Sequence, residues 1–352
     1  MDFAAQVDER LHNLAKPPGS LGLLEQQVRQ VFLAWGSFQE ELRPRHIIFA
    51  ADNGVVRSGV VAQLSDITYM QSVHMTEGTS AVTCFCRCHG IPYEVVDVGI
   101  DSEDAVGVDR KIARGTADFS VQPAMTTEQF TRAAAVGRER VEAAKARGCN
   151  ILSFGEMGIG NTTTSAAVLT AIAPAGSAFL VGHGSSKGNY RLWFHKEQVV
   201  KEALQKYKEE IQTPEDALRC VGGFDLAALY GAMLACAEAR LPFYIDGFIT
   251  AVALACAVKT RPNVRQYALP SHISREPGMS AALRLCGIDE YDVPIHADMA
   301  LGEGTGAVLG VVMLQTMLYA VGHMATLDGI NGEAEERHRR RMEKGAEHQD
   351  DR

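Results

Sequence analysis

The sequence has no surplus of positive charge. Its 34 lysine and arginine residues are outnumbered by 43 aspartate and glutamate residues, and the formal net charge at pH 7 is −9. Nucleic-acid binding depends on an excess of basic side chains that face the phosphate backbone. The composition therefore argues against a nucleic-acid partner, and an anionic ligand has to be met by a local group of donors.

A long apolar run and a targeting segment are also missing. The longest apolar stretch, residues 306–322, contains small and polar residues and is shorter than the roughly 20 residues that a membrane helix needs. Residues 1–22 alternate between acidic and basic side chains without the apolar segment of a signal peptide. We therefore expect a cytoplasmic protein that does not contact a membrane, with residues 306–322 in a buried helix.

The eight cysteines do not show the spacing of a metal site. Three of them lie in CFCRCH, residues 84–89, which precedes Gly90 as the end of a helix does, and side chains two positions apart on a helix point apart. No second cysteine or histidine pair lies near enough in sequence to complete a four-ligand zinc site. We expect reduced thiols, no metal and no cofactor.

Short apolar runs without alternation recur along the chain, and each ends in a Gly-rich or polar turn. Such runs are typical of parallel strands buried on both faces, and helical stretches such as residues 126–148 lie between them. This order predicts an α/β fold, with a Rossmann-like parallel sheet, helices on both of its faces, and ligands at the carboxyl ends of the strands. The expected strands, each taken together with the turn that ends it, lie in residues 46–54, 93–101, 150–161, 178–186, 242–248 and 266–274.

The two ends of the chain have helical patterns and no strand candidates. We expect residues 1–42 and 311–352 to form a small helical domain, and residues 43–310 to form the α/β catalytic domain. Residues 332–352 are a run of charges without an apolar face, which is typical of a solvated helix end or a disordered tail.

SFGEMGIGNTTTSAA, residues 153–167, resembles a P-loop that lacks its lysine. Three glycines lie between a strand expected to end at Phe154 and a helix expected from about Asn161, so free backbone N–H groups would face an anion. Because a P-loop lysine serves a transferring phosphoryl group, a loop without it suits a phosphate that is held and not transferred, as in a nucleoside monophosphate. The alternative is a turn that needs its glycines only for close packing.

Two further Gly-rich turns favour the phosphate interpretation. GHGSS, residues 182–186, follows the next expected strand, and LGEGTGA, residues 301–307, places Glu303 between two glycines before a helix expected from about Thr305. Glu303 either complements the dipole of that helix or carries chemistry. Glu156 in the first loop would repel a phosphate unless it turns toward a sugar or a developing cation.

Seven stretches resemble, in order and spacing, the nicotinate-nucleotide:dimethylbenzimidazole phosphoribosyltransferases of cobamide lower-ligand assembly. The resemblance implies a two-domain homodimer, with a heterodimer with a paralogue as the alternative. It also implies a pentosyltransferase that moves the 5-phosphoribosyl group of nicotinate mononucleotide to an aromatic base and releases nicotinate. The stretches are KPPGSLG (16–22), ADNGV (51–55), GEMGIGNTTTSAA (155–167), GGFDLAALYGAML (222–234), DGFI (246–249), SHISREPG (271–278) and LGEGTGA (301–307).

The resemblance also implies roles for single residues. Glu303 would be the general base, and Glu156 would stabilise an oxocarbenium-like sugar. Lys196 would supply the cation that the loop lacks, unless it is a solvent-facing helical lysine. The nucleotide-binding residues would be Gly155, Met157, Gly158, Ile159, Gly160, Asn161, Thr162, Gly182, His183, Gly184, Lys196, Ser271 and Ser274. The residues at the acceptor base would be Asp52, Ser65, Leu301 and Gly302.

The acceptor side departs from the family pattern. Many members have GVSAYPQEVT where this chain has GVVAQLSDIT, which places Ser65 at a glutamine that lies against the aromatic base, Leu64 at the proline and, upstream, Asn53 at a histidine. Ala300 stands where an arginine commonly precedes LGEGTGA. These changes predict a different acceptor, either a phenol or a substituted benzimidazole. Two other hypotheses stay open, namely a catalytically weak partner subunit and an NTPase with Asp52 as the Mg²⁺ partner of a degenerate P-loop.

Overall fold

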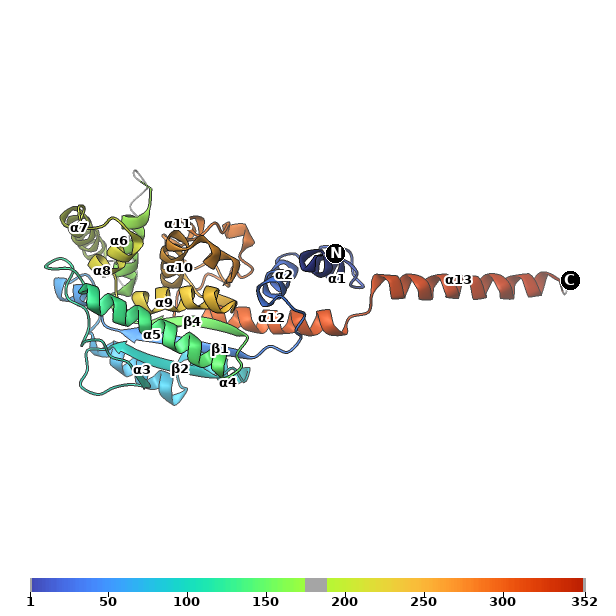
Figure 1. Ribbon diagram of the computed structural model, residues 1–352, viewed down its shortest axis with the longest axis horizontal. Coiled ribbons are helices and arrows are strands. Elements are labelled where there is room, and N and C mark those ends of the chain that lie inside the picture. The colour runs from blue at the N-terminus through green and yellow to red at the C-terminus, as the bar shows by residue number, and fades with distance from the viewer. Residues whose placement is uncertain (1, 175–188, 351–352) are drawn as a thin grey trace. The chain divides into compact units, whose positions relative to one another are not determined.

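The computed structural model describes residues 2–174 and 189–350. Within residues 42–312 the chain forms a parallel sheet with helices beside it (Figure 1). The fold class expected from the sequence is confirmed. Five of the expected strands are present with shifted ends, the two-residue strand β3 was not expected, and the expected strand at residues 178–186 lies outside the described residues. The strands are β1 (Pro44–Ala51), β2 (Tyr93–Gly99), β3 (Val108–Asp109), β4 (Ile151–Met157), β5 (Phe243–Ile245) and β6 (Ala268–Pro270).

The strand order is β3-β2-β1-β4-β5-β6, and every neighbouring pair is parallel. This is the order of nucleotide-binding doubly wound sheets, in which the chain changes direction between the first and the fourth strand. Three aromatic rings contact one another across the sheet: Phe49 of β1 stacks on Phe154 of β4 with ring centroids 6.4 Å apart, and the tilted ring of Phe243 in β5 lies 5.5 Å from that of Phe154. A ligand is therefore expected at the carboxyl ends of the strands near the β1–β4 switch.

The described helices vary in length from 7 to 24 residues. They are α1 (Phe3–His12), α2 (Leu23–Trp35), α3 (Asp66–Glu77), α4 (Ala81–Cys88), α5 (Thr127–Ala146), α6 (Asn161–Ile172), α7 (Tyr190–Lys206), α8 (Pro214–Val221), α9 (Phe224–Ala239), α10 (Phe248–Thr260), α11 (Met279–Leu285), α12 (Thr305–His323) and α13 (Leu327–Asp350). Short 3₁₀ turns occur at Gly54–Ser58, Pro262–Gln266 and Glu290–Asp292.

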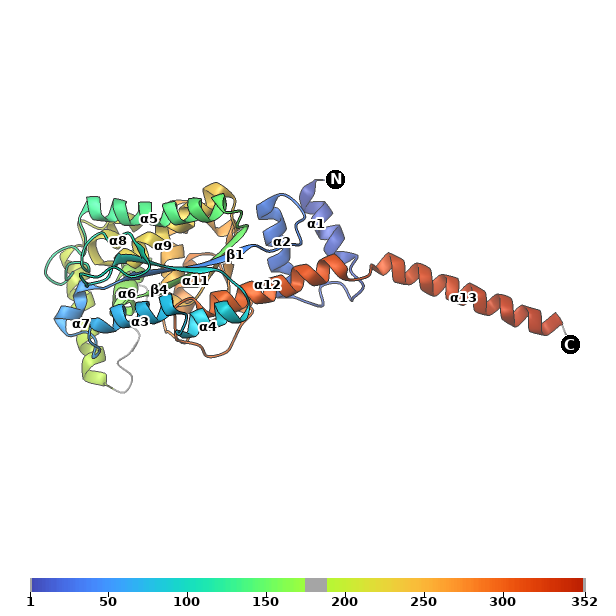
Figure 2. The ribbon, with the colours of Figure 1, turned by 90° about the horizontal axis from the view of Figure 1, so that it is seen from below.

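Helices cover both faces of the sheet (Figure 2). On one face α9 contacts β1, β2 and β4 and packs against α5, and on the other face α3 contacts the same three strands. Helix α5 begins with a capping box at Thr126 and Gln129, as its sequence pattern predicts. The two helices approach closely at glycine, because a Cβ at Gly137 of α5 would lie 1.9 Å from the carbonyl oxygen of Ala228 in α9.

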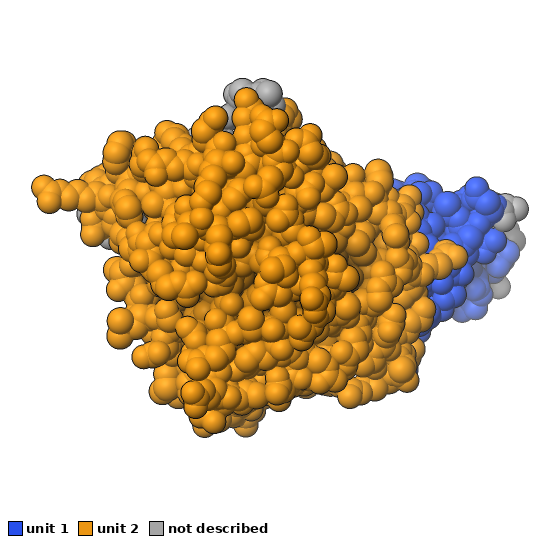
Figure 3. All heavy atoms as spheres, turned by 60° about the vertical axis from the view of Figure 1, so that its left-hand side comes forward, with its two compact units in different colours: residues 1–41, 313–352 blue, residues 42–312 orange. Residues whose placement is uncertain are grey.

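The chain divides into two compact units, one of residues 1–41 with 313–352 and one of residues 42–312 (Figure 3). In the first unit the two ends of the chain are joined by backbone hydrogen bonds. The N–H of Ala15 donates to Ala325 and the N–H of Leu327 donates to Asn13, each at 2.8 Å. The second unit holds the whole sheet.

Helix α12 corrects one expectation. It has 19 residues and is long and apolar enough to cross a membrane by length and composition, whereas the run at residues 306–322 was expected to be too short. In this structure 56% of its most apolar window is buried inside the protein. A Cβ at Gly310 would lie 2.7 Å from the Tyr244 ring of β5. The helix therefore packs against the sheet, as expected of a buried helix.

The stretch CFCRCH ends a helix, as expected, because α4 ends at Cys88. All eight cysteines are free, and on α4 Cys86 is buried whereas Cys84 and Cys88 are exposed. Within residues 2–174 and 189–350, no group of three or more histidine, cysteine, aspartate and glutamate side chains is arranged to hold a metal ion.

Candidate active site

A cavity of about 720 Å³ opens at the carboxyl ends of β4, β5 and β6. Four segments form most of its walls: the end of β4 with the start of α6, the start of α10, the loop after β6, and the turn before α12. The lining residues are 156–162, 246–250, 272–277 without Ile273, and 300–303, together with Val61 and, from α3, Ile67 and Gln71. The cavity thus lies where ligands bind in doubly wound sheets.

The cavity collects most of the residues singled out from the sequence. Those that line it are Glu156, Met157, Gly158, Ile159, Gly160, Asn161, Thr162, Ser274, Leu301, Gly302 and Glu303. Five others do not line it, namely Asp52, Ser65, Gly155, Lys196 and Ser271. Gly182, His183 and Gly184 lie outside the described residues.

The first Gly-rich loop is shorter than the sequence suggested. Strand β4 does not end at Phe154 but continues to Met157, and its Gly155 pairs with Ile48 of β1. Only three residues, 158–160, connect β4 to α6, which begins at Asn161 as expected. This connection is too short for the loop of a P-loop NTPase, so the NTPase hypothesis loses its main support.

Gly155 serves close packing and does not offer a free loop N–H group. A Cβ at this position would lie 2.0 Å from the carbonyl oxygen of Glu303. The glycine therefore lets the turn that carries Glu303 lie directly on β4. The packing alternative is the better account of Gly155, which corrects its assignment as an anion donor.

Asn161 binds carboxylates across the floor of the cavity. Its side-chain amide donates to Glu156 Oε2 and, at 3.3 Å, to Asp225 Oδ2 of α9. Burial, followed by repulsion from Asp225 and Asp246, raises the pKa of Glu156 to about 8. Burial likewise raises the pKa of Asp225 to about 7. The raised pKa values favour the neutral forms of both carboxyl groups, and a cationic ligand beside Glu156 would favour its ionised form.

Glu303 sits in a strained turn. Its φ is +64°, and the φ angles of its neighbours Gly302 and Gly304 are +86° and +94°. A side chain in this left-handed region costs about 1–3 kcal/mol unless the surroundings hold it. The glycines on either side are needed because the backbone on both sides has the same sign of φ.

Glu303 lines the cavity, and its carboxylate is held by a hydrogen bond. Oε1 accepts this hydrogen bond of 2.7 Å from Nε2 of Gln71, and Oε2 is buried. Burial raises the pKa of Glu303, and the hydrogen bonds from Gln71 and from the Val82 backbone oppose this shift. Glu303 is thus placed to accept a proton from a ligand.

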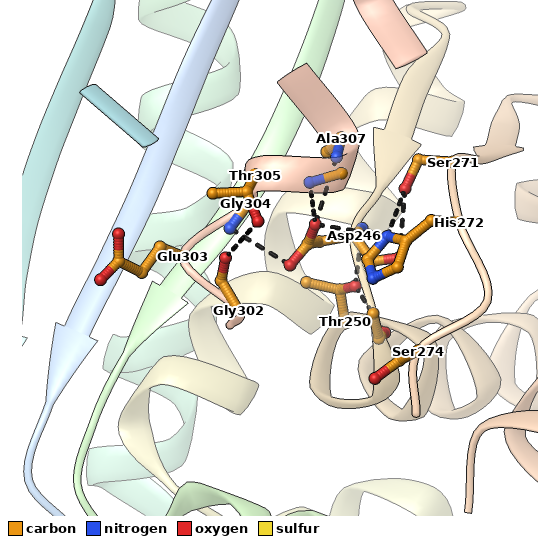
Figure 4. A network of polar contacts seen from close by, with 12 residues as sticks. Asp246, Thr250, Ser271, His272, Ser274, Gly302, Glu303, Gly304, Thr305 and Ala307 are labelled. Atoms are coloured by element: carbon orange, nitrogen blue, oxygen red, sulfur yellow. Dashed lines mark hydrogen bonds and ion pairs between the residues drawn. The ribbon is translucent and has the colours of Figure 1, made fainter. Parts of the chain in front are cut away.

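The dipole of α12 is complemented by Asp246 and not by Glu303. Asp246 follows β5 and accepts backbone hydrogen bonds from Gly306 at 2.7 Å and from Gly304 and Ala307 at 3.2 Å. Figure 4 shows these bonds, with the Glu303 side chain pointing away from them. The alternative role for Glu303 at the helix N-terminus is therefore excluded.

Ser271 and His272 support Asp246. The Ser271 hydroxyl donates to the Asp246 carbonyl at 3.2 Å, and Nδ1 of His272 lies 3.7 Å from Asp246 Oδ1. Ser271 is fully buried, so its expected contact with the nucleotide is replaced by this contact with the Asp246 backbone. Ser274, by contrast, lines the cavity.

Lys196 is buried behind the cavity wall. It is 1% exposed, and its Nζ donates to Thr162 Oγ1 at 3.2 Å. Burial lowers the pKa of Lys196 to about 8, opposed by the charge of Glu276 on the cavity wall. The alternative of a solvent-facing lysine is therefore wrong.

The acceptor-side residues are placed differently from the expectation. Asp52 accepts the N–H of Asp101 at 2.8 Å, so it holds the turn after β2. Ser65 precedes α3, and the glutamine of the cavity is Gln71, which lies one helical turn after Ile67 on the cavity side of α3. Because a glutamine contacts Glu303 after all, the change at Ser65 no longer indicates a different acceptor.

Four of the polar cavity residues that went unassigned in the sequence are Gln71, Asp246, His272 and Arg275. Arg275 is the only lysine or arginine among the described lining residues, and it forms an ion pair of 3.1 Å with Asp298. DGFI and SHISREPG drew attention to three of the four, but their roles depend on contacts distant in sequence. The spacing of Ile67 and Gln71, four residues apart, was the available signal for the fourth.

The comparison with known families defines the class of enzyme. A sequence model described as phosphoribosyltransferase matches residues 1–330. The chain is therefore a phosphoribosyltransferase, which is a pentosyltransferase enzyme.

Relatives and solved structures narrow the class. The chain is 38% identical to a nicotinate-nucleotide--dimethylbenzimidazole phosphoribosyltransferase of Cupriavidus necator, with 93% of each chain covered. It is 35% identical to a protein of the same name from Clostridium perfringens, over 94% of this chain and 91% of the relative. A crystal structure of CobT from Thermus thermophilus matches with a TM-score of 0.86 and 34% identity, over 94% of this chain and 98% of that one. The chain belongs to the nicotinate-nucleotide--dimethylbenzimidazole phosphoribosyltransferase family.

Proposed function

We propose that this chain transfers the 5-phosphoribosyl group of nicotinate mononucleotide to 5,6-dimethylbenzimidazole or a related base, in cobamide biosynthesis. The observation that carries the proposal is the Glu303 side chain, which lines the cavity and whose carboxylate Gln71 holds through Oε1. We infer the substrates from the names of the relatives. The cavity contains a carboxylate that can act as the general base.

The reaction needs one proton acceptor. A ring nitrogen of the base attacks C1′ of the ribose, the bond from C1′ to the pyridinium nitrogen breaks, and nicotinate leaves with that electron pair. The other ring N–H of the base becomes acidic as the new bond forms, and the Glu303 carboxylate accepts its proton. The products are the α-riboside phosphate, nicotinate and one proton.

Glu156 is assigned to the sugar. It lies at the end of β4 and accepts the Glu303 N–H through Oε1 at 3.4 Å, so the two carboxylates flank the same part of the cavity. Positive charge that develops on the ribose would favour the ionised form of Glu156, as a carboxylate does in glycosidases.

The phosphate is assigned to the start of α6. Gly158, Gly160 and Thr162 lie at the N-terminus of this helix, where the helix dipole and free N–H groups favour an anion. Lys196 adds positive charge behind Thr162. Met157, Ile159, Asn161 and Ser274 complete the nucleotide side, and the backbone of Gly302 with the Leu301 side chain would cover the acceptor base.

Glu303→Gln tests the base directly. The amide keeps the size of the side chain but cannot accept the proton, so transfer should fall by a factor of about 10² to 10⁴ while nucleotide binding persists. Release of nicotinate by the purified single chain, with and without the base, is the measurement. Near-normal turnover in this variant would remove Glu303 from the mechanism, and an inactive wild-type chain would favour the partner-subunit hypothesis.

The preferred acceptor is open to a competition experiment. Of the departures from the family pattern named above, Ala300 lines the described cavity and Ser65 does not. Because Gln71 contacts Glu303, we expect dimethylbenzimidazole to be used in preference to p-cresol. Equimolar competition followed by separation of the two riboside phosphates measures this, and predominant p-cresol transfer would contradict it.

The assembly and compartment are part of the same proposal. Free thiols at all eight cysteines fit a reducing compartment, and we expect a cytoplasmic homodimer. Light scattering on the purified chain, and on the chain mixed with a paralogue, distinguishes a homodimer from a heterodimer.

A further inference from the structure

A buried histidine holds the carbonyl oxygen of Glu303, and the reaction above does not use it. His46 of β1 is 0% exposed, and its Nε2 lies 3.0 Å from the Glu303 carbonyl oxygen. On the other side of the ring, Nδ1 lies 2.8 Å from the hydroxyl of Ser153 in β4. His46 does not line the cavity, so it acts on the Glu303 turn without facing a substrate.

The two partners of His46 define its protonation state. A carbonyl oxygen only accepts, so Nε2 carries the proton and Nδ1 accepts the hydrogen bond from the Ser153 hydroxyl. Burial lowers the pKa of His46 to about 4, which keeps the ring neutral near pH 7. The ring therefore links β4 to the Glu303 carbonyl with a fixed donor direction.

The strained turn is held from several sides. The N–H of Glu303 donates to Glu156, and the N–H of Gly304 donates to Asp246 at 3.2 Å. Both acceptors also line the cavity, whereas His46, which holds the Glu303 carbonyl, does not. The turn lies against the ring so closely that a Cβ at Gly304 would lie 2.1 Å from His46 Cε1.

We propose that His46 is a positioning residue that sets the direction of the Glu303 carboxylate through the Glu303 backbone, and that Ser153 orients His46 for this task. The proposal rests on the proposed function, because it assigns a rate effect to the geometry of the base. A base displaced by about 1 Å loses up to about 10² in rate while substrates still bind. The effect therefore belongs to kcat and not to KM.

Two amide variants of equal polarity form a matched pair. The amide nitrogen of His46→Gln reaches about as far as Nε2, whereas that of His46→Asn reaches only about as far as Nδ1. We expect His46→Gln to keep kcat within about threefold of the wild type, and His46→Asn to lose about 10- to 100-fold in kcat with both KM values unchanged. Ser153→Ala should fall between them.

The outcomes separate positioning from folding. Wild-type kcat in His46→Asn overturns the proposal, and so does an equal loss in both amide variants accompanied by the same drop in Tm, since that pattern marks a purely structural role. If the wild type releases no nicotinate, the proposed function fails instead. Long-range ¹H–¹⁵N correlation of the His46 ring then tests the proposal by itself, and a proton on Nδ1 overturns it.

Discussion

Glu303 could be singled out from the sequence because its backbone conformation requires glycine at the neighbouring positions. Three consecutive residues, 302–304, have positive φ angles, which glycine adopts most readily. The sequence Gly-Glu-Gly at these positions therefore indicates an unusual turn around a glutamate. Gln71 and Asp246 have no such pattern in the residues next to them. The contact of Gln71 with Glu303 spans 232 residues, and Asp246 caps a helix that begins 59 residues later. Residue pairs like these are determined by the fold and not by neighbours in the chain.

The buried carboxyl of Glu156 makes stability depend on pH in a definite direction. Its pKa in the folded protein is raised to about 8, above the value of an unfolded chain. The contribution of Glu156 to the free energy of unfolding is therefore greatest below the pKa of the unfolded chain. This contribution is lost as the pH rises through about 8. We therefore expect Glu156 to lower the Tm of the ligand-free protein as the pH rises from about 4.5 to about 8.

Glu156→Gln should remove much of that slope and raise Tm at the alkaline end, while it lowers the rate of transfer. Thermal unfolding across this pH range measures the effect, with Asp225→Asn as the comparison, because burial also raises the pKa of Asp225, to about 7. An unchanged slope in both variants would show that these carboxyl groups are ionised throughout.

At the scale of elements, the type of each element was easier to predict than its ends. Continuous apolar runs indicated five of the strands, whereas β3 has only two residues and carries no pattern. The end of β4 was placed too early because Gly155 was interpreted as a turn residue. Its actual role, the close approach of the Glu303 turn, depends on a segment 148 residues away in the chain.

Gly155→Ala tests that contact between elements. The added methyl group would lie 2.0 Å from the Glu303 carbonyl oxygen, so the turn has to shift and kcat should fall by at least about tenfold. Gly332→Ala is a suitable control because a Cβ there meets no atom within 4 Å. A raised KM for the nucleotide with unchanged kcat would instead support the original assignment of Gly155 to the phosphate.

At the scale of the whole chain, the structure has a unit built from both ends and a unit that carries the sheet. The family match stops at residue 330, within the first turn of α13. Residues 331–343 of that helix are exposed, whereas Asn13 still contacts Leu327 and Asp328. The charge run was therefore correctly recognised as lacking a buried face over residues 331–343.

A chain that ends at Gly332 should keep its activity and its Tm. The deletion removes no described buried side chain, and it leaves the hydrogen bonds between Asn13 and the start of α13 in place. Differential scanning calorimetry and nicotinate release, compared between full-length and shortened chains, measure this. A lower Tm in the shortened chain would assign the tail a stabilising role.

The left-handed backbone at Glu303 has a consequence for laboratory evolution. Glycine or asparagine adopts this conformation more readily than glutamate, so either substitution would relax the turn. A library selected for heat resistance alone should accordingly accumulate both residues at position 303. With Glu303 as the proposed base, these proteins would lack transfer activity, and selection for the reaction would be what keeps a strained residue at this position.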